Sequence, residues 1–293
     1  MQDPETGENV LLHETTGEVM EAVEIMVPRG TITRSPDEQE AHRKLRERER
    51  SRKARREETD IWGTFCFVNR EGHFDDMKPE YVTKLMYLST YAGYGGSLML
   101  TERSKMTQDC LETVLGVSEA TVQRFLAEAD GQYLIHKGDM LYLDKKTFVR
   151  GMINRLSYEA SYVKLCRNGM RGLYTHAGRH VHRQIGYLFQ MLPFLNTEYN
   201  MLCWSPSEKD PDRIYPMTLK EFCSHIGYNT RNMKRLAESY DRIVFPYDGH
   251  EERFCSILGD RSEPETTRIY LNPHVLYSGK HPKEVLEAGH FTD

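Results

Sequence analysis

Two stretches of the chain repeat one hydrophobic pattern 111 residues apart, and this repeat restricts the fold more than any other feature. Without a gap, MTQDCLETVLGVSEATVQRFLAEAD (106–130, the first repeat) aligns with MTLKEFCSHIGYNTRNMKRLAESYD (217–241, the second repeat). In both, apolar residues recur at helical spacing on either side of a glycine, Gly116 or Gly227. Glycine suits a tight turn between two helices because it tolerates positive φ. The sequence therefore predicts two copies of a helix–turn–helix unit.

A short β-hairpin is predicted after each repeat. After the first, Lys137-Gly138-Asp139 is a tight-turn signal between two apolar runs. After the second, 243–245 and 268–271 are the expected strands, separated by a polar excursion that contains Asp248-Gly249. Helix, turn, helix and hairpin in this order indicate a winged helix-turn-helix. The predicted fold class is mainly α with small β-hairpin wings (α+β), arranged as two winged helix-turn-helix modules in tandem.

The length of 293 residues also favours two modules of about 100–150 residues each. Residues 1–60 show no sustained hydrophobic period, whereas 65–68 is predicted as a strand and 81–91 as a helix. The expected segments are a charged, largely flexible N-terminal arm (1–60), winged-helix module A (61–150), a basic connector (151–183), winged-helix module B (184–280) and a C-terminal tail (281–293).

The net charge of −5 conceals blocks of opposite sign. Residues 1–42 carry ten acids against two arginines, residues 43–56 carry nine bases against two glutamates, and residues 150–183 carry seven bases against one glutamate. Two basic blocks in an acidic protein indicate local contact with a polyanion. For 43–56 we expect nonspecific affinity for nucleic acid.

Several classes of protein are excluded or disfavoured. No run approaches the ~18 uninterrupted apolar residues of a membrane span, and the acidic N-terminus lacks the order of a secretory signal. The six cysteines show no CxxC spacing and are expected to be reduced, mostly buried thiols. We therefore expect a cytoplasmic protein without a membrane partner.

The run LGVSEATVQRFLAEADGQYLIHKGDMLYLDKKTFVRG, like the second copy ending in RIYLNPHVLYSG, resembles winged-helix regulators and RepL-type plasmid replication initiators of Gram-positive bacteria and their phages. Those families typically continue from the wing into an Asn-Pro segment followed by an aromatic residue and glycine, here Asn272-Pro273, Tyr277 and Gly279. The likeness covers 61–150 and 184–280. RepL-type proteins have one module where this chain has two. The resemblance implies sequence-specific duplex binding and leaves transcription control and replication initiation open.

In a helix-turn-helix, outward-facing residues near the start of the second helix meet base edges in the major groove. In the second repeat these residues are Thr230, Arg231, Asn232, Lys234 and Arg235. Arginine can bind guanine bidentately and asparagine adenine, each contact giving about 1–3 kcal/mol of discrimination. Three positive charges without an acid suit a phosphate-rich target, and a merely solvated helix face is the alternative.

The first repeat offers fewer candidates for base contact, Gln123 and Arg124, together with Lys137 at the wing. Glu119 near the start of that helix repels phosphate, so a dimerisation or protein-binding surface is the alternative interpretation. In the connector, basic residues interleaved with tyrosines are typical of arms that follow a phosphate backbone. Its candidate DNA contacts are Arg167, Arg171, Arg179 and Arg183. An amphipathic helix with a solvated basic side would look the same.

Enzymatic motifs are scarce. The chain contains no GxxxxGK[ST], HExxH or GxSxG pattern. His180-Val181-His182 could hold a divalent metal beside Tyr187, as in rolling-circle nicking enzymes, but its flanks are Arg179 and Arg183 rather than apolar residues. The two histidines are more simply explained as phosphate contacts. We expect no catalytic residue, no bound metal and no cofactor.

The sequence thus predicts a nonenzymatic DNA-binding protein of phage or plasmid origin. Transcriptional regulation is the first interpretation, replication initiation by origin binding is the second, and a winged-helix scaffold for protein interactions is the third. The expected partners are double-stranded DNA and the transcription or replication machinery of host or phage. A homodimer and a monomer that spans two groove segments about 34 Å apart both remain open.

Overall fold

The structure is a computed structural model that describes residues 11–12, 19–20, 40–41, 43–47, 49, 64–151, 162–260, 263–279 and 282–292. The chain divides into two units, Met1–Arg56 and Glu57–Asp293. In the first unit, β1 (Leu11–Leu12) pairs antiparallel with β2 (Val19–Met20). The described part of 40–49 is helical, with Lys44 Nζ 2.7 Å from Glu40 Oε1. The remainder of the expected arm lies outside the described residues.

The unit Glu57–Asp293 is a mixture of helices and small antiparallel sheets, so the α+β class is confirmed. Its largest sheet has the strand order β12–β7–β3–β6. These strands are β3 (Phe65–Asn69), β6 (Phe148–Val149), β7 (Tyr162–Cys166) and β12 (Leu276–Tyr277). The central pair is antiparallel, with Phe65 opposite Cys166 and Asn69 opposite Tyr162. Sequence distant from the repeats therefore supplies the centre of the sheet.

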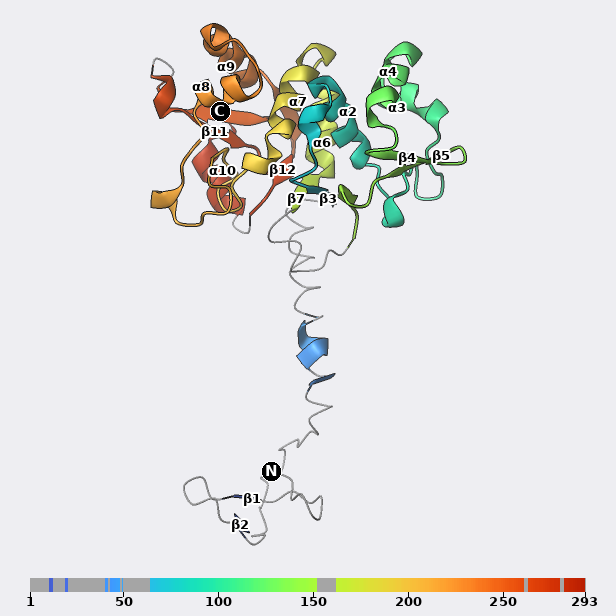
Figure 1. The fold of residues 1–293 in the computed structure, drawn as a ribbon, viewed down its shortest axis with the longest axis vertical. Coiled ribbons are helices and arrows are strands. Elements are labelled where there is room, and N and C mark those ends of the chain that lie inside the picture. Colours follow the sequence, from blue (N-terminus) through green and yellow to red (C-terminus); the bar gives the residue numbers. More distant parts are fainter. Residues whose placement is uncertain are drawn as a thin grey trace. The chain divides into compact units, whose positions relative to one another are not determined.

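Three helices lie above β3 and β7 and between the two helix pairs described below (Figure 1). They are α2 (Pro79–Ser89), α6 (Arg167–His176) and α7 (His182–Gln190). Helix α2 packs closely against α7, because Gly186 leaves no side chain between α7 and the Pro79 carbonyl. Tyr87 and Tyr174 stack with ring centroids 3.9 Å apart and join α2 to α6. The core is thus continuous between the helices.

The first repeat folds as two helices followed by a hairpin. Gly116 ends the first helix in the left-handed conformation (φ 60°), as its position in the repeat predicts. The apolar side chains of both helices, among them Leu115 and Phe125, are buried. The elements of this half are η1 (Phe74–Asp76), η2 (Tyr94–Gly96), η3 (Gln108–Cys110), α3 (Leu111–Leu115), α4 (Glu119–Ala129), β4 (Leu134–Lys137) and β5 (Met140–Leu143).

The second repeat also folds as two helices, with Gly227 at φ 66° between them. The elements of this half are η4 (Arg179–Val181), η5 (Leu192–Phe194), η6 (Pro211–Arg213), α8 (Leu219–His225), η7 (Thr230–Asn232), α9 (Met233–Asp241), β8 (Val244–Tyr247), β9 (His250–Arg253), β10 (Cys255–Leu258), η8 (Pro264–Thr266) and β11 (Arg268–Leu271). The hairpin after the repeat differs from the expectation. Strand β11 pairs with β10 rather than with β8, because the chain reverses at Asp248-Gly249 and β8 pairs with β9.

The two halves share backbone pairing beyond the helices. In the first half the N–H of Met106 donates to the Leu98 carbonyl, and the N–H of Leu98 donates to the Leu141 carbonyl in β5. The same two hydrogen bonds recur in the second half, from Met217 to Leu202 and from Leu202 to Ile269 in β11. Each helix pair is therefore joined to its hairpin through a third short extended segment.

The match continues past the hairpins. The N–H of Phe148 donates to the Asp144 carbonyl as the chain enters β6, and the N–H of Leu276 donates to the Asn272 carbonyl as it enters β12. Strand β6 then pairs with β3, and β12 pairs with β7. Since β3 and β7 are themselves antiparallel, the strands of the two halves are related by an approximate two-fold rotation.

Residues 162–183, expected as part of a basic connector, form β7, α6, η4 and the start of α7. Residues 152–161 of that segment lie outside the described residues. The expected C-terminal tail contains α10 (Pro282–Gly289), whose Val285 packs with Cys166 and Tyr277. Both segments therefore contribute to the packing of the unit.

All six cysteines carry free thiols, as expected, and five of them are buried. Burial raises the pKa of Cys66 to about 11 and that of Cys166 to about 12. Such thiols stay protonated at neutral pH, so they act as small apolar core residues.

Candidate nucleic-acid interface

The second repeat exposes the side chains expected to read DNA. Arg231, Asn232, Lys234 and Arg235 are exposed, and Thr230 is half-buried. None of the three cations forms an ion pair with the residues that the structure describes, since the ion pairs found there involve other groups. The opposite side of α9 is buried through Leu236, Ala237 and Tyr240. The helix therefore presents a basic, unpaired face to solvent.

Local contacts hold this face in place. The Asn229 carboxamide accepts a hydrogen bond from the Arg231 N–H at 3.0 Å, which caps η7 ahead of α9. On the inner side, the Tyr240 hydroxyl donates to the Gln184 carbonyl at 3.0 Å. Helix α9 is thus fixed at its start by a cap and along its length by contact with α7.

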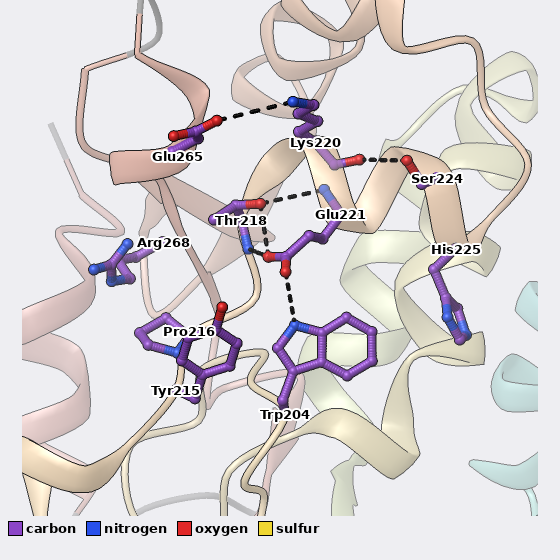
Figure 2. A pocket seen from close by; sticks show the side chains of 10 residues that line it. All are labelled: Trp204, Tyr215, Pro216, Thr218, Lys220, Glu221, Ser224, His225, Glu265 and Arg268. Carbon is purple, nitrogen blue, oxygen red and sulfur yellow. Dashed lines mark hydrogen bonds and ion pairs between the residues drawn. The ribbon is translucent and has the colours of Figure 1, made fainter.

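Helix α8 begins with a capping box. The Thr218 hydroxyl accepts the Glu221 N–H at 3.2 Å, and the Glu221 carboxylate accepts the Thr218 N–H at 2.8 Å. The other carboxylate oxygen accepts the Trp204 indole N–H at 3.2 Å (Figure 2). Burial alone would raise the pKa of Glu221, but the hydrogen bonds from Thr218 and Trp204 outweigh it and lower this pKa. The start of the second repeat is therefore rigid and charged.

An open pocket of about 700 Å³ lies beside α8. Figure 2 shows its lining residues, among them the exposed aromatic rings of Trp204 and Tyr215. The polar groups are engaged within the chain, since Arg268 donates to the Thr266 and Thr267 carbonyls. The sequence did not reveal this pocket, because Trp204 and Tyr215 come together only when their backbones pair across 11 residues.

The first repeat has a mixed surface. Gln123 and Arg124 are exposed on α4, as expected, and so is Glu119. The acids at the other end of α4 are engaged within the chain. Glu128 accepts from the backbone N–H of Lys78 at 2.9 Å and pairs with its ammonium group, while Asp130 lies 3.5 Å from His136. Only Glu119 therefore leaves an acid near the expected groove-facing side of this helix.

The wings differ in charge. In the first, Lys137 Nζ lies 4.9 Å from the centre of the Tyr142 ring, and Lys105 donates to the Tyr142 hydroxyl at 3.1 Å. Sequence reasoning identified Lys137 but missed Lys105, which precedes the first repeat by one residue. In the second half, the described part of the loop between β10 and β11 carries Asp260, Glu263 and Glu265. Two lysines thus lie at the first hairpin, whereas the described residues of the loop before β11 include three acids.

The four candidate arginines of the expected connector separate into two pairs. Arg179 and Arg183 are exposed around the start of α7, with Arg179 beside Gly116 of the first repeat. Arg167 and Arg171 are half-buried near the start of α6. The ten residues of α6 span about 15 Å. Arg167 is therefore at the far end of α6 from Arg179, whereas Arg171 lies near the middle of the helix.

The two histidines of the His-Val-His pattern lie in different environments. His180 is exposed, whereas His182 is buried with its ring 4.4 Å from that of Tyr174. Burial lowers the pKa of His182 to about 4, so its imidazole is neutral at physiological pH. Among the residues of 64–292 that the structure describes, no group of three or more His, Cys, Asp or Glu side chains is placed to hold a metal ion.

Comparisons with known proteins give no relative, since no protein-family model matches the chain and neither the curated proteins nor the solved structures contain a significant match. In the part of the chain that the structure describes, no helix combines the length and the apolar character needed to cross a bilayer. Functional conclusions therefore rest on the geometry of the chain itself.

Proposed function

We propose that this protein binds double-stranded DNA in a sequence-specific manner through two winged helix-turn-helix units. The units are α3–α4 with the β4–β5 wing and α8–α9 with the β10–β11 wing. The main reading helix is α9 with the η7 turn before it. The observation that carries the proposal is the exposed, unpaired face of Arg231, Asn232, Lys234 and Arg235 on the second helix after a glycine turn.

The backbone of each half supports the assignment of winged units. In both halves a short extended segment pairs with the last strand of the hairpin and with the residue that opens the repeat. This pairing connects a wing to its helix pair, so the two move as one body. The β4–β5 wing, held in this way and carrying Lys137, can contact the DNA backbone while α4 lies in the major groove. We assign no phosphate contact to the acidic loop of the second wing.

The remaining basic residues extend the surface beyond α9. Arg124 and Gln123 are the base contacts that we assign to α4. Lys137 on the first wing supplies phosphate contacts together with Lys105, which lies beside that wing at Tyr142. Arg179 and Arg183 stand at the start of α7, which lies between the two helix pairs (Figure 1). We assign them to backbone phosphates between the two half-sites. Arg167 and Arg171 are not part of this surface in the proposal.

The test is to select duplexes that bind the full chain from a random library. The affinity of the chain for the selected duplex is then measured by titration. Arg231→Ala with Arg235→Ala should abolish the preference for the selected sequence over an unrelated one. Arg213→Ala, which removes an exposed arginine that pairs with Asp210 on η6, is the control and should leave the preference intact. Affinity should fall with salt at a log–log slope near −0.9 per phosphate neutralised.

An unchanged preference in the double variant would refute the assignment of α9 as the reading helix. Affinity that does not depend on salt would refute DNA binding through this basic surface. The genomic positions of the bound sites then separate the two roles. Sites at promoters support transcriptional regulation, and a cluster of repeated sites beside an easily melted segment supports replication initiation.

A further inference from the structure

Three arginines lie close together at the C-terminal end of α2, next to α6. Arg150, which follows β6, donates to the Ala92 carbonyl at 2.7 Å. Arg171 on α6 donates from Nε to the Thr90 hydroxyl at 3.0 Å. Arg167, also on α6, lines the same hollow as Arg150. All three are half-buried.

The hydrogen-bonding of this cluster is incomplete. Arg167 Nε and Arg171 Nη2 are both shielded from solvent, and neither has a hydrogen-bond partner among the described residues. A buried donor without a partner is destabilising, and more so when the group is charged. Burial lowers the pKa of Arg167, and repulsion from Arg171 and Arg150 lowers it further. The cluster therefore destabilises the chain as it stands.

The surroundings offset only part of this charge. The C-terminus of α2 supplies roughly half a negative charge through its dipole. Arg171 lies 3.9 Å from the centre of the Tyr91 ring and Arg150 lies 5.3 Å from that of Tyr94, and such contacts attract the charged guanidinium groups. Of the described residues, no carboxylate pairs with any of the three arginines, since the ion pairs found involve other side chains. Within the described residues, the three positive charges thus have no carboxylate partner.

We propose that Arg150, Arg167 and Arg171 form a phosphate-binding site at the end of α2. Guanidinium groups bind phosphate oxygens through paired, charge-assisted hydrogen bonds, and three of them supply the unused donors that an oxyanion accepts. Tyr94, whose side chain is 75% exposed, stands next to Arg150 at the rim and offers a ring on which a nucleobase can stack. The ligand class is a phosphate carried by a free nucleotide or by a nucleic-acid backbone.

This site is independent of the surface on α9. It uses none of the residues assigned above to base contacts, and its Arg167 lies at the opposite end of α6 from Arg179. Loss of phosphate binding here would leave sequence preference through α9 unaffected, and the reverse also holds. The two proposals can therefore fail separately.

The test follows thermal unfolding of the full chain in inorganic pyrophosphate, with chloride adjusted to keep the ionic strength constant. The melting temperature of the wild type should rise by about 5 °C when pyrophosphate exceeds its dissociation constant a hundredfold. Arg167→Met removes the charge and the unpaired donor while keeping an unbranched side chain. Without pyrophosphate this variant should melt above the wild type, because repulsion is relieved, and with pyrophosphate the order should reverse.

Two further variants complete the design. Arg167→Lys keeps the charge and should retain part of the response, which a purely structural effect of Arg167→Met would not explain. Arg103→Met removes an exposed arginine of the loop before the first repeat and should respond as the wild type does. The proposal is overturned if the wild type does not respond, or if Arg167→Met responds equally. An excess of duplex of unrelated sequence distinguishes a free nucleotide from a nucleic-acid backbone as the ligand. The duplex suppresses the shift in melting temperature caused by pyrophosphate only if the site binds backbone phosphates.

Discussion

The two repeats have the same backbone arrangement and differ in the side chains that they expose. In the second, the exposed face of η7 and α9 is basic and the described part of the β10–β11 loop carries acids, whereas in the first, α4 carries Glu119 and lysines lie on and beside the β4–β5 hairpin. The hydrogen bonds that connect each helix pair to its hairpin are nevertheless the same. The two halves therefore share a backbone arrangement while their exposed side chains differ. A duplex bound by both units would meet two different surfaces, so we expect an asymmetric target.

The repeats also differ in how their first helices begin. Helix α8 starts with the capping box of Thr218 and Glu221. The first repeat starts with the 3-10 turn η3, where the Thr107 hydroxyl contacts Cys110 Sγ at 3.4 Å and does not cap the backbone. The second half further contains the extra β8–β9 hairpin, whose β8 packs on α6. The second half thus has a capped first helix and an additional hairpin packed on α6, which the described residues of the first half lack.

The largest expected effect on stability comes from a substitution at the contact between α2 and α7, which joins the two halves. Gly186→Ala places a Cβ about 1.8 Å from the Pro79 carbonyl oxygen, so the helices must move apart. We expect a loss of about 3 kcal/mol or more in the free energy of unfolding, because both partners are helix backbone. Urea unfolding followed by circular dichroism measures it.

Gly172→Ala on α6 is the graded control, since its Cβ lies 3.0 Å from the Pro246 carbonyl oxygen and needs a smaller adjustment. Alanine in a helix is otherwise favoured over glycine by about 1 kcal/mol. A stabilised Gly186→Ala variant would therefore show that the two halves are not in close contact through these helices.

The second-largest effect concerns pH. His182 begins α7, and its carbonyl accepts the Thr83 hydroxyl of α2 at 2.7 Å, so it joins the second half to the first. Burial lowers its pKa to about 4, below the value near 6.5 of an unfolded chain. Its contribution to stability is therefore complete above pH 6.5 and declines as the pH falls towards 4, by up to about 3 kcal/mol.

The measurement is the urea midpoint of the wild type and of His182→Phe between pH 7 and pH 4. The variant lacks the titrating group, so the difference between the two curves should change only in this window. Parallel curves would mean that His182 is accessible to protons in the folded chain and does not couple the halves to pH.

Local pattern was sufficient to predict the repeats. The glycine turns, the helices on either side of them and the first hairpin at Lys137-Gly138-Asp139 are each encoded in a short local segment, and the structure contains them. The exposure of Arg231 and Arg235 could be predicted for the same reason. Helical periodicity assigns each residue to an inner or an outer face without knowledge of the rest of the chain.

Long-range pairing was not predictable in this way. Strand β7 lies in a segment dominated by basic residues, and only its pairing with β3, about 100 residues earlier, makes it a central strand. The same packing half-buries Arg167 and Arg171, which local sequence could only assign to an exposed arm. Likewise, the pairing of β11 with β10 depends on the chain reversal at Asp248-Gly249. The sequence shows this turn, but it does not show which strands pair across it.

A smaller effect sharpens the difference between the helix starts. Thr218→Ala removes the hydroxyl that caps α8 and should cost about 1 kcal/mol of unfolding free energy. Thr107→Ala in the first repeat removes no backbone cap and should stay within about 0.5 kcal/mol of the wild type. Chemical denaturation of both variants measures the difference, and equal losses would show that the capping box adds nothing to the second repeat.

The smallest effect tests whether the first repeat contacts DNA at all. Glu119→Gln removes the one acid near the expected groove-facing side of α4, so affinity for the selected duplex should rise about two- to fivefold at low salt and less at high salt, where charges are screened. Fluorescence anisotropy at two salt concentrations measures this change. Glu287→Gln, on the exposed side of α10, alters the net charge equally and is the matched control. If both variants gain the same affinity, net charge rather than position accounts for it, and the protein would contact the duplex through the second repeat alone.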